Sequence, residues 1–302
     1  MKIVIHSLLL LLAVSTHAQS LIDSTQLIQD IQTLSSDKYE GRMAGTRGSR
    51  QAQFYLIGRF KQIGLSAYHN TYEYPFYFSQ GEKQIMGTNL FGYIQGKSDS
   101  TIVVTAHYDH LGIRKGIAAD KDSIYNGADD NASGVGGLLA LMAYYKKHQP
   151  EHTMIFVAFD GEEEGLQGAK AFVKQPPVSV TQMVLNINMD MIGRNDKNEL
   201  YVCGLTQFPE LKQYVDEAVN TGGQVKVLSG HDKKEEGSNN WINQSDHYEF
   251  YKLKIPMLYF GVEDHPDYHQ VSDEFKGIQP SFYYHAVLKV LTVLESADKG
   301  LK

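Results

Sequence analysis

Cysteine and positive charge are scarce in this 302-residue sequence. Cys203 is the only cysteine, which excludes an intramolecular disulfide and a cysteine-based zinc knuckle. The net charge is −7 and the sequence pI is about 5.9, so we expect neither a nucleic-acid partner nor an anionic membrane surface. The eight prolines are scattered, and there is no internal repeat or low-complexity tract. With 42% hydrophobic and 21% charged residues, the composition is that of a folded globular protein.

The N-terminal residues form a short apolar segment. A lysine at position 2 precedes an apolar run at residues 3–14, and Thr16-His17-Ala18 offers a small-x-small cleavage site. This pattern predicts a signal peptide over residues 1–18, cleaved near Ala18, and a mature chain that is secreted or periplasmic. The run is too short to span a membrane comfortably, although an uncleaved anchor is the alternative. No cysteine directly follows the run, which excludes a lipoprotein anchor. We expect no membrane span in residues 19–302.

Apolar, β-branched runs alternate with amphipathic segments, which predicts an α/β fold. The predicted buried strands are residues 101–106, 154–159, 182–188, 200–203 and 255–260. The predicted helices are residues 21–34, 51–63, 132–148, 169–174, 209–221 and 279–297. Residues 70–96 predict a hairpin or edge strands, residues 35–50 predict a polar loop broken by glycines, and residues 229–246 predict a polar surface loop. Because no linker divides the chain, we expect one domain whose sheet is covered on both faces, with its site at the carboxyl ends of strands.

The segment YNGADDNASGVGG (residues 125–137) sets two adjacent carboxylates, Asp129 and Asp130, in a tight turn before an apolar helical run. Taken alone, the pair could simply cap that helix. Negative charge in such a turn is nevertheless costly unless a cation or the helix N-terminus compensates it. The turn therefore raises the question of which cation it binds.

Other candidate ligands fall near the ends of predicted strands: His107, Glu162, Glu163, Asp190 and His269. Each is weak on its own, but burying so many carboxylates without a cation is strongly unfavourable. Histidine and carboxylate are the ligands that zinc accepts without cysteine. The set is too large for one tetrahedral zinc and predicts two metals, about 3.5–4 Å apart, that share a bridging carboxylate. The adjacent Glu162 and Glu163 could divide the roles of ligand and proton carrier.

Five motifs occur in one order along the chain: AHYDHLG (106–112), GADDNASG (127–134), FDGEEEGLQG (159–168), NMDMIGR (188–194) and YHQVSD (268–273). In this order they resemble the secreted di-zinc aminopeptidase family, which includes bacterial leucyl aminopeptidases, glutamate carboxypeptidases, glutaminyl cyclases and the metal-free transferrin receptors. The segment EGRMAGTRGS (40–49) resembles the family's lead-in. The resemblance covers essentially the whole mature chain. It implies a single-domain zinc-exopeptidase fold, with a central mixed β-sheet covered by helices on both faces.

The resemblance also implies the ligands of two Zn²⁺ ions per chain: His107, Asp130, Glu163, Asp190 and His269. Asp130 would bridge both ions, and the Asp130–Asn131 peptide bond would be cis. One ion would be completed by His107 and Asp190, and the other by Glu163 and His269.

Three further residues acquire catalytic roles from the same resemblance. Glu162 matches the general base that takes a proton from water and delivers it to the leaving amine. Asp109 matches a carboxylate that orients His107, and Tyr268 matches a tyrosine whose hydroxyl stabilises the oxyanion.

The remaining titratable residues near these motifs match no ligand position. We expect His110, His247 and His265 to be structural or to lie at the rim of the site. Glu164 is expected to be solvated, and Asp246 either lines the pocket or caps a turn.

These roles predict an aminopeptidase that acts as a monomer on peptides with a free N-terminus. Glutaminyl cyclases work with one zinc, whereas His107 and Asp190 are both present here. Carboxypeptidase relatives usually carry inserted domains, for which this chain has no room. A binding protein that has lost its metals is the third alternative, and the complete ligand set argues against it. The preferred N-terminal residue depends on loops such as 229–246, whose conformation the sequence does not supply.

Overall fold

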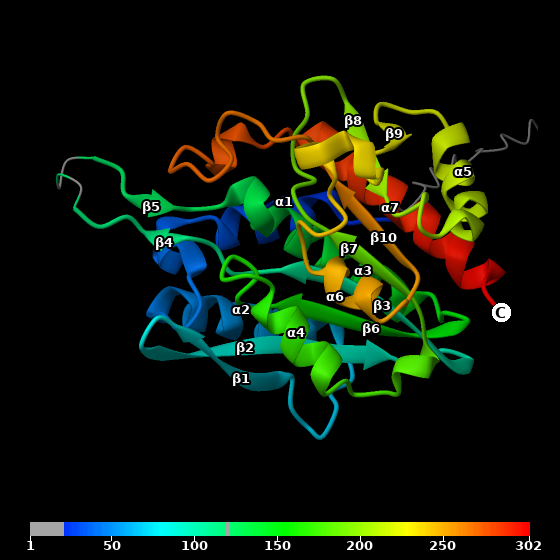
Figure 1. The fold of residues 1–302 in the computed structure, drawn as a ribbon, viewed down its shortest axis with the longest axis horizontal. Helices are drawn as coiled ribbons and strands as arrows, with labels where there is room; N and C mark the ends of the chain where they lie inside the picture. The colour runs from blue at the N-terminus through cyan, green and yellow to red at the C-terminus, as the bar shows by residue number, and fades with distance from the viewer. Residues whose placement is uncertain (1–20, 117, 119–120) are drawn as a thin grey trace, which may run out of the picture.

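The computed structural model describes residues 21–116, 118 and 121–302, so the predicted signal peptide lies outside the described residues. An eight-stranded sheet crosses the molecule in the order β1-β2-β6-β3-β7-β10-β8-β9 (Figure 1). Its strands are β1 (Glu73–Gln80), β2 (Lys83–Ile94), β3 (Ser98–His107), β6 (His152–Phe159), β7 (Met183–Met189), β8 (Glu199–Cys203), β9 (Lys226–Ser229) and β10 (Met257–Gly261). A small antiparallel pair, β4 (Gly112–Ile113) and β5 (Ile124–Tyr125), lies apart from the sheet.

The four central strands, β6, β3, β7 and β10, are parallel to one another. On one side of them, β2 pairs antiparallel with β6, and β1 pairs antiparallel with β2. On the other side, β8 is antiparallel to β10 and β9 is parallel to β8. The sheet is therefore mixed, as predicted. Because the carboxyl ends of the parallel strands meet at one edge, the segments that follow them come together there.

Helices cover both faces of the sheet, which confirms the predicted fold class (Figure 1). One face carries α1 (Ser24–Leu34), α2 (Arg47–Ile63), α3 (Gly134–Lys147) and α7 (Pro280–Gly300), with α5 (Lys212–Asn220) packed on α7. The opposite face carries α4 (Gln167–Lys174) and α6 (His247–Lys252). A hydrophobic core lies on each face of the sheet, and alternate residues of β3 pack in the two cores. Ile102 and Val104 pack in the first, and Val103 packs in the second with Phe172 and Phe250.

Several segments differ from their predicted conformations. The predicted loop 35–50 contains a 3-10 helix, Asp37–Arg42. Helix α2 begins at Arg47 rather than at residue 51, because the Thr46 side chain caps it by accepting the Ser49 N–H at 3.3 Å. The predicted surface loop 229–246 contains a 3-10 helix, Lys234–Asn239, and it buries Trp241. No helix within the described part of the chain combines the length and the apolar character that a membrane crossing requires.

Candidate metal centre

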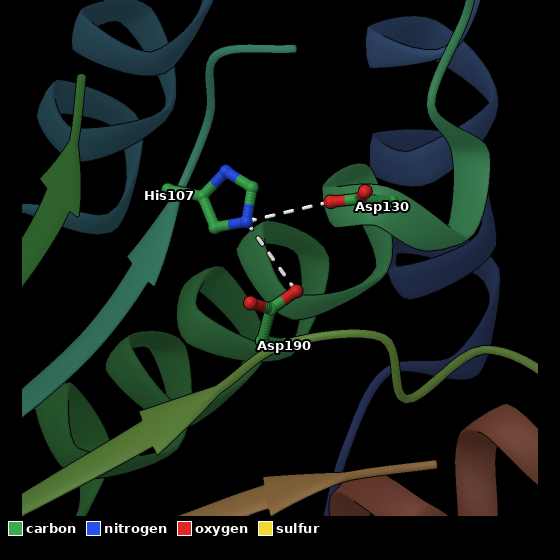
Figure 2. A group of neighbouring side chains, drawn as sticks. All are labelled: His107, Asp130 and Asp190. Carbon is green, nitrogen blue, oxygen red and sulfur yellow. Dashed lines mark ion pairs between the residues drawn. The ribbon is translucent and has the colours of Figure 1, made fainter. Parts of the chain in front are cut away.

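The first group of candidate ligands consists of His107, Asp130 and Asp190, all buried (Figure 2). His107 ends β3, Asp190 follows β7 directly, and Asp130 belongs to the tight turn Ala128–Ser133 that precedes α3. His107 Nε2 lies 3.5 Å from Asp130 Oδ1 and 3.3 Å from Asp190 Oδ1. Among the described residues, neither His107 Nε2 nor Asp190 Oδ1 has a hydrogen-bond partner. These atoms therefore face one another with their lone pairs available for a cation.

The second group uses the other oxygen of Asp130. His269 Nε2, from the loop after β10, lies 3.1 Å from Asp130 Oδ2 and 3.2 Å from Glu163 Oε2. Asp130 thus directs Oδ1 to the first group and Oδ2 to the second. A carboxylate that bridges two metal ions requires this arrangement, and the imidazole and carboxylate donors suit zinc.

His110 also faces the second group, although its sequence position matched no ligand. Its Nδ1 lies 2.7 Å from Glu163 Oε1 and 3.7 Å from Asp130 Oδ2, and the side chain is fully buried. The only sequence signal was a second histidine in AHYDHLG, three residues after His107. That spacing does not indicate which way the ring points, so the sequence alone could not identify this contact.

The three predicted catalytic residues surround these groups. Glu162 lines the cleft beside Asp130, and the half-buried Tyr268 stacks on the His269 ring at a centroid distance of 3.9 Å. The Asp109 carboxylate accepts the N–H groups of Glu162 at 3.1 Å and Glu163 at 3.2 Å. Asp109 also contacts His107 Nδ1, through its carbonyl oxygen at 3.3 Å and its Oδ1 at 3.7 Å. Asp109 therefore contacts both the acidic turn and the histidine.

The acidic groups of the site are costly to ionise without a cation. Burial and the neighbouring Glu163 raise the pKa of Asp130, and burial raises the pKa of Glu162 well above its usual value. Burial would lower the pKa of His107, but the carboxylates of Asp190 and Glu162 raise it well above the ordinary value. The raised pKa values of these carboxyl groups and of His107 show an excess of buried negative charge, which a bound cation would compensate.

Two acidic residues that were assigned outside the catalytic set are less exposed than the sequence suggested. The prediction that Glu164 is solvated is wrong, because it is partly buried and burial raises its pKa to about 7. Asp246 precedes α6, but its side chain caps nothing. Both Asp246 oxygens are buried without a hydrogen-bond partner among the described residues, and burial raises the pKa of this carboxyl well above its usual range.

The turn that carries Asp130 is held by side chains on both sides. Asp273 accepts the backbone N–H groups of Asp129 and Asp130, at 3.0 Å each through its nearer oxygens. Asp129 accepts the Gly193 N–H at 2.6 Å and contacts His265 Nε2 at 3.1 Å, so His265 is structural, as expected. The Asp130–Asn131 peptide bond is cis, as the resemblance implied.

A buried arginine from the EGRMAG segment ties this turn to β3. The Arg42 guanidinium is fully buried and donates hydrogen bonds to the carbonyl oxygens of Leu34, Tyr108, Asn126 and Gly127. Burial lowers its pKa to about 10, while Asp130, Asp273 and other carboxylates oppose that shift. Arg42 thus joins the chain after His107 to the chain before Asp130.

The cleft above the ligands is formed by residues from the site and from the segment after β9. Its lining residues are Asp130, Glu162, Asp190, Met191, Trp241, Gln244, Tyr259, Val262, Asp264, Tyr268 and His269. The Trp241 indole is stacked on His231, with ring centroids 3.7 Å apart and an interplanar angle of 6°. A segment that reads as polar in the sequence therefore supplies an aromatic wall.

Comparison with known proteins agrees with the interpretation of this site as a zinc site. The chain is 28% identical over 181 residues to the alkaline phosphatase isozyme conversion protein of Escherichia coli K12, covering 57% of this chain and 52% of that protein. It is 32% identical over 165 residues to a probable zinc metalloprotease of Pyrenophora tritici-repentis, covering 51% of this chain and 36% of that protein. The chain thus spans about half of the length of the first relative and about a third of the length of the second.

Solved structures share the fold over nearly the whole chain. The glutaminyl cyclase of Porphyromonas gingivalis matches with a TM-score of 0.74 and 18% identity, covering 91% of this chain and 98% of that one. A leucine aminopeptidase precursor from Bacteroides thetaiotaomicron matches with a TM-score of 0.72, also at 18% identity, covering 91% of this chain and 97% of that one. At this identity the likeness shows the fold alone. The sequence profile described as Peptidase family M28 matches residues 89–294, about two thirds of the sequence, so this chain belongs to that family of zinc peptidases.

Proposed function

We propose that this chain is a zinc aminopeptidase that removes N-terminal residues from peptides. His107, Asp130 and Asp190 would hold one Zn²⁺, and Asp130, Glu163 and His269 would hold a second. Bound zinc supplies a Lewis acid that polarises a carbonyl group and lowers the pKa of water. The buried, converging side chains of His107, Asp130 and Asp190 offer nitrogen and oxygen lone pairs that fit that ion.

The charge of the cleft carries the aminopeptidase assignment. The described residues that line it include four carboxylates and neither lysine nor arginine. One of the four, Asp264, is exposed and belongs to neither metal group. A carboxypeptidase needs a cation to bind the substrate's C-terminal carboxylate, whereas an aminopeptidase needs an anion for the terminal ammonium group. The lining supports the second alternative.

The chain's own residues would move the proton during hydrolysis. Glu162 would accept a proton as the water oxygen bonds to the peptide carbonyl carbon. It would then deliver that proton to the amine nitrogen as the C–N bond breaks, releasing an amino acid and a shortened peptide. Burial raises the pKa of Glu162, which suits a group that must also act as an acid. The Tyr268 hydroxyl would donate a hydrogen bond to the oxyanion.

The N-terminal pattern adds a proposal about location. We propose that residues 1–18 are a signal peptide cleaved near Ala18 and that residues 19–302 form the peptidase domain. The mature protein would work as a monomer in the periplasm or outside the cell.

Hydrolysis of aminoacyl anilides by the purified mature protein tests this function. Chelator-sensitive release from substrates with a free amine, lost when the amine is acetylated, with about two zinc ions per chain, would support it. Two bound ions without release from any anilide would reject the aminopeptidase. Assays of C-terminal release and of glutaminyl-peptide cyclisation would then separate the two alternatives. Absence of zinc after loading would favour a binding protein.

A further inference from the structure

His110 has no role in the proposed reaction, yet its position is closely defined. His110 belongs to the AHYDHLG segment, and its ring is fully buried against the turn that carries Asp130. It packs on Gly127 so tightly that a Cβ added there would lie 2.5 Å from His110 Cδ2. Tyr125 meets the ring edge-on, at a centroid distance of 6.4 Å. Packing therefore fixes the orientation of the ring and directs Nδ1 toward Glu163.

We propose that His110 is a positioning residue for the second zinc ion, acting through Glu163. The imidazole donates its Nδ1–H to Glu163 Oε1 at 2.7 Å, because the carboxylate oxygen can only accept. The other oxygen, Oε2, lies 3.2 Å from His269 Nε2, on the side where the ion would bind. The hydrogen bond occupies one carboxylate oxygen and leaves the other for the metal. This inference rests on the second metal site of the proposed function.

Hydrogen bonding distinguishes this role from direct ligation. A histidine that binds a metal almost always donates its other ring N–H to a nearby acceptor. His107 meets this condition, because Nε2 faces the first group and Nδ1 lies 3.3 Å from the Asp109 carbonyl oxygen. His110 does not, because its Nε2 is buried without a partner among the described residues. With Nδ1 on a metal, the proton would sit on that buried Nε2, and a buried N–H without a partner is destabilising.

Substitutions at His110 can separate the donor from the ring. An Asn side chain places its amide nitrogen close to the Nδ1 position, whereas a Gln side chain carries it one methylene further. His110→Asn therefore preserves the donor to Glu163, and His110→Gln and His110→Ala do not. His148→Ala is the matched control, because His148 caps the far end of α3, where its ring stacks on Tyr144 and its Nδ1 lies 2.9 Å from the Tyr144 carbonyl oxygen.

The measurement is the affinity of each bound zinc ion, obtained by competition with a chromophoric chelator on the full mature protein. We expect the Ala and Gln variants to keep the first ion and to bind the second about 10- to 100-fold more weakly. The Asn variant and the His148 control should bind both ions like the wild type. Wild-type affinity in His110→Gln would overturn the proposal, and so would weakened binding in His110→Asn. The Asn and Gln pair decides the outcome even if the Ala variant fails to fold. A wild-type protein that binds a single zinc ion would instead reject the second site of the proposed function.

Discussion

Glu162 and Glu163 are adjacent in sequence but have opposite electrostatic environments. Burial opposes the ionisation of both side chains. Contacts with His110 and His269 nevertheless hold the pKa of Glu163 well below its usual value. Among the described residues, no histidine is hydrogen-bonded to Glu162, and burial together with Glu163 raises its pKa, against the opposing charge of His107. Two neighbouring carboxyls whose pKa values are driven apart suit different tasks, a permanent anion at the metal and a carrier of protons.

Removing the proton carrier should stop turnover without removing the metal. We expect Glu162→Gln to bind zinc like the wild type and to lower kcat by about 10²–10⁴-fold, because the amide has the same shape but accepts no proton. The measurements are kcat on an aminoacyl anilide and zinc content by mass spectrometry. Glu164→Gln, two positions along the same turn, is the control and should retain most of its activity. Near-normal turnover in Glu162→Gln would assign the base to another residue.

At the scale of the elements, the strands were predictable and their arrangement was not. The strands β3, β6, β7 and β10 are buried on both faces, so their apolar runs stand out in the sequence. Their order in the sheet depends on pairings between distant segments, which no local pattern encodes. The likeness of five motifs to a known family, rather than strand periodicity, assigned the proposed ligands to two groups, and the structure brings the side chains of each group together.

The segment after β9 shows why the rest could not be predicted. Its polar composition indicated a surface loop, yet Asp232 accepts the N–H groups of Gly204 and Thr206, at 3.1 and 2.9 Å. These hydrogen bonds hold Asp232 in place, next to His231, whose ring stacks on the Trp241 indole at the cleft. Contacts between residues about 30 positions apart determine this conformation, and the local sequence carries no signal for them.

The Trp241 wall should influence which N-terminal residue is accepted. We expect Trp241→Ala to raise KM for leucyl and phenylalanyl anilides by about 10-fold or more relative to alanyl anilide, because large apolar side chains lose the contact. Trp241→Phe retains an aromatic face, so its KM for these substrates should lie between the values of the wild type and of Trp241→Ala. The measurement is kcat/KM over this substrate panel. An unchanged ratio between the substrates would mean that the cleaved residue does not contact the indole.

At the scale of the whole molecule, many of the buried ionisable groups lie at the carboxyl edge of the sheet, and His247 is one of them. Its ring is fully buried, stacks on Tyr259 at a centroid distance of 4.5 Å and donates from Nε2 to the Trp241 carbonyl oxygen at 3.0 Å. Burial lowers the pKa of His247 to about 4, with the Trp241 hydrogen bond opposing the shift. The folded protein therefore holds this histidine neutral at a pH where the unfolded chain protonates it.

This difference should appear as acid sensitivity of folding. The stability that His247 contributes is fully present above pH 6.5, its ordinary pKa, and is lost as the pH falls toward its folded pKa of about 4. The loss amounts to about 3 kcal/mol, at 1.36 kcal/mol per pKa unit. His247→Gln keeps a donor near Nε2 but does not titrate, so its free energy of unfolding should fall less over this interval. Urea denaturation of both proteins, with chelator present so that zinc release affects neither, measures the difference. Parallel curves for the two proteins between pH 7 and pH 4 would show that His247 is not the group that senses acid.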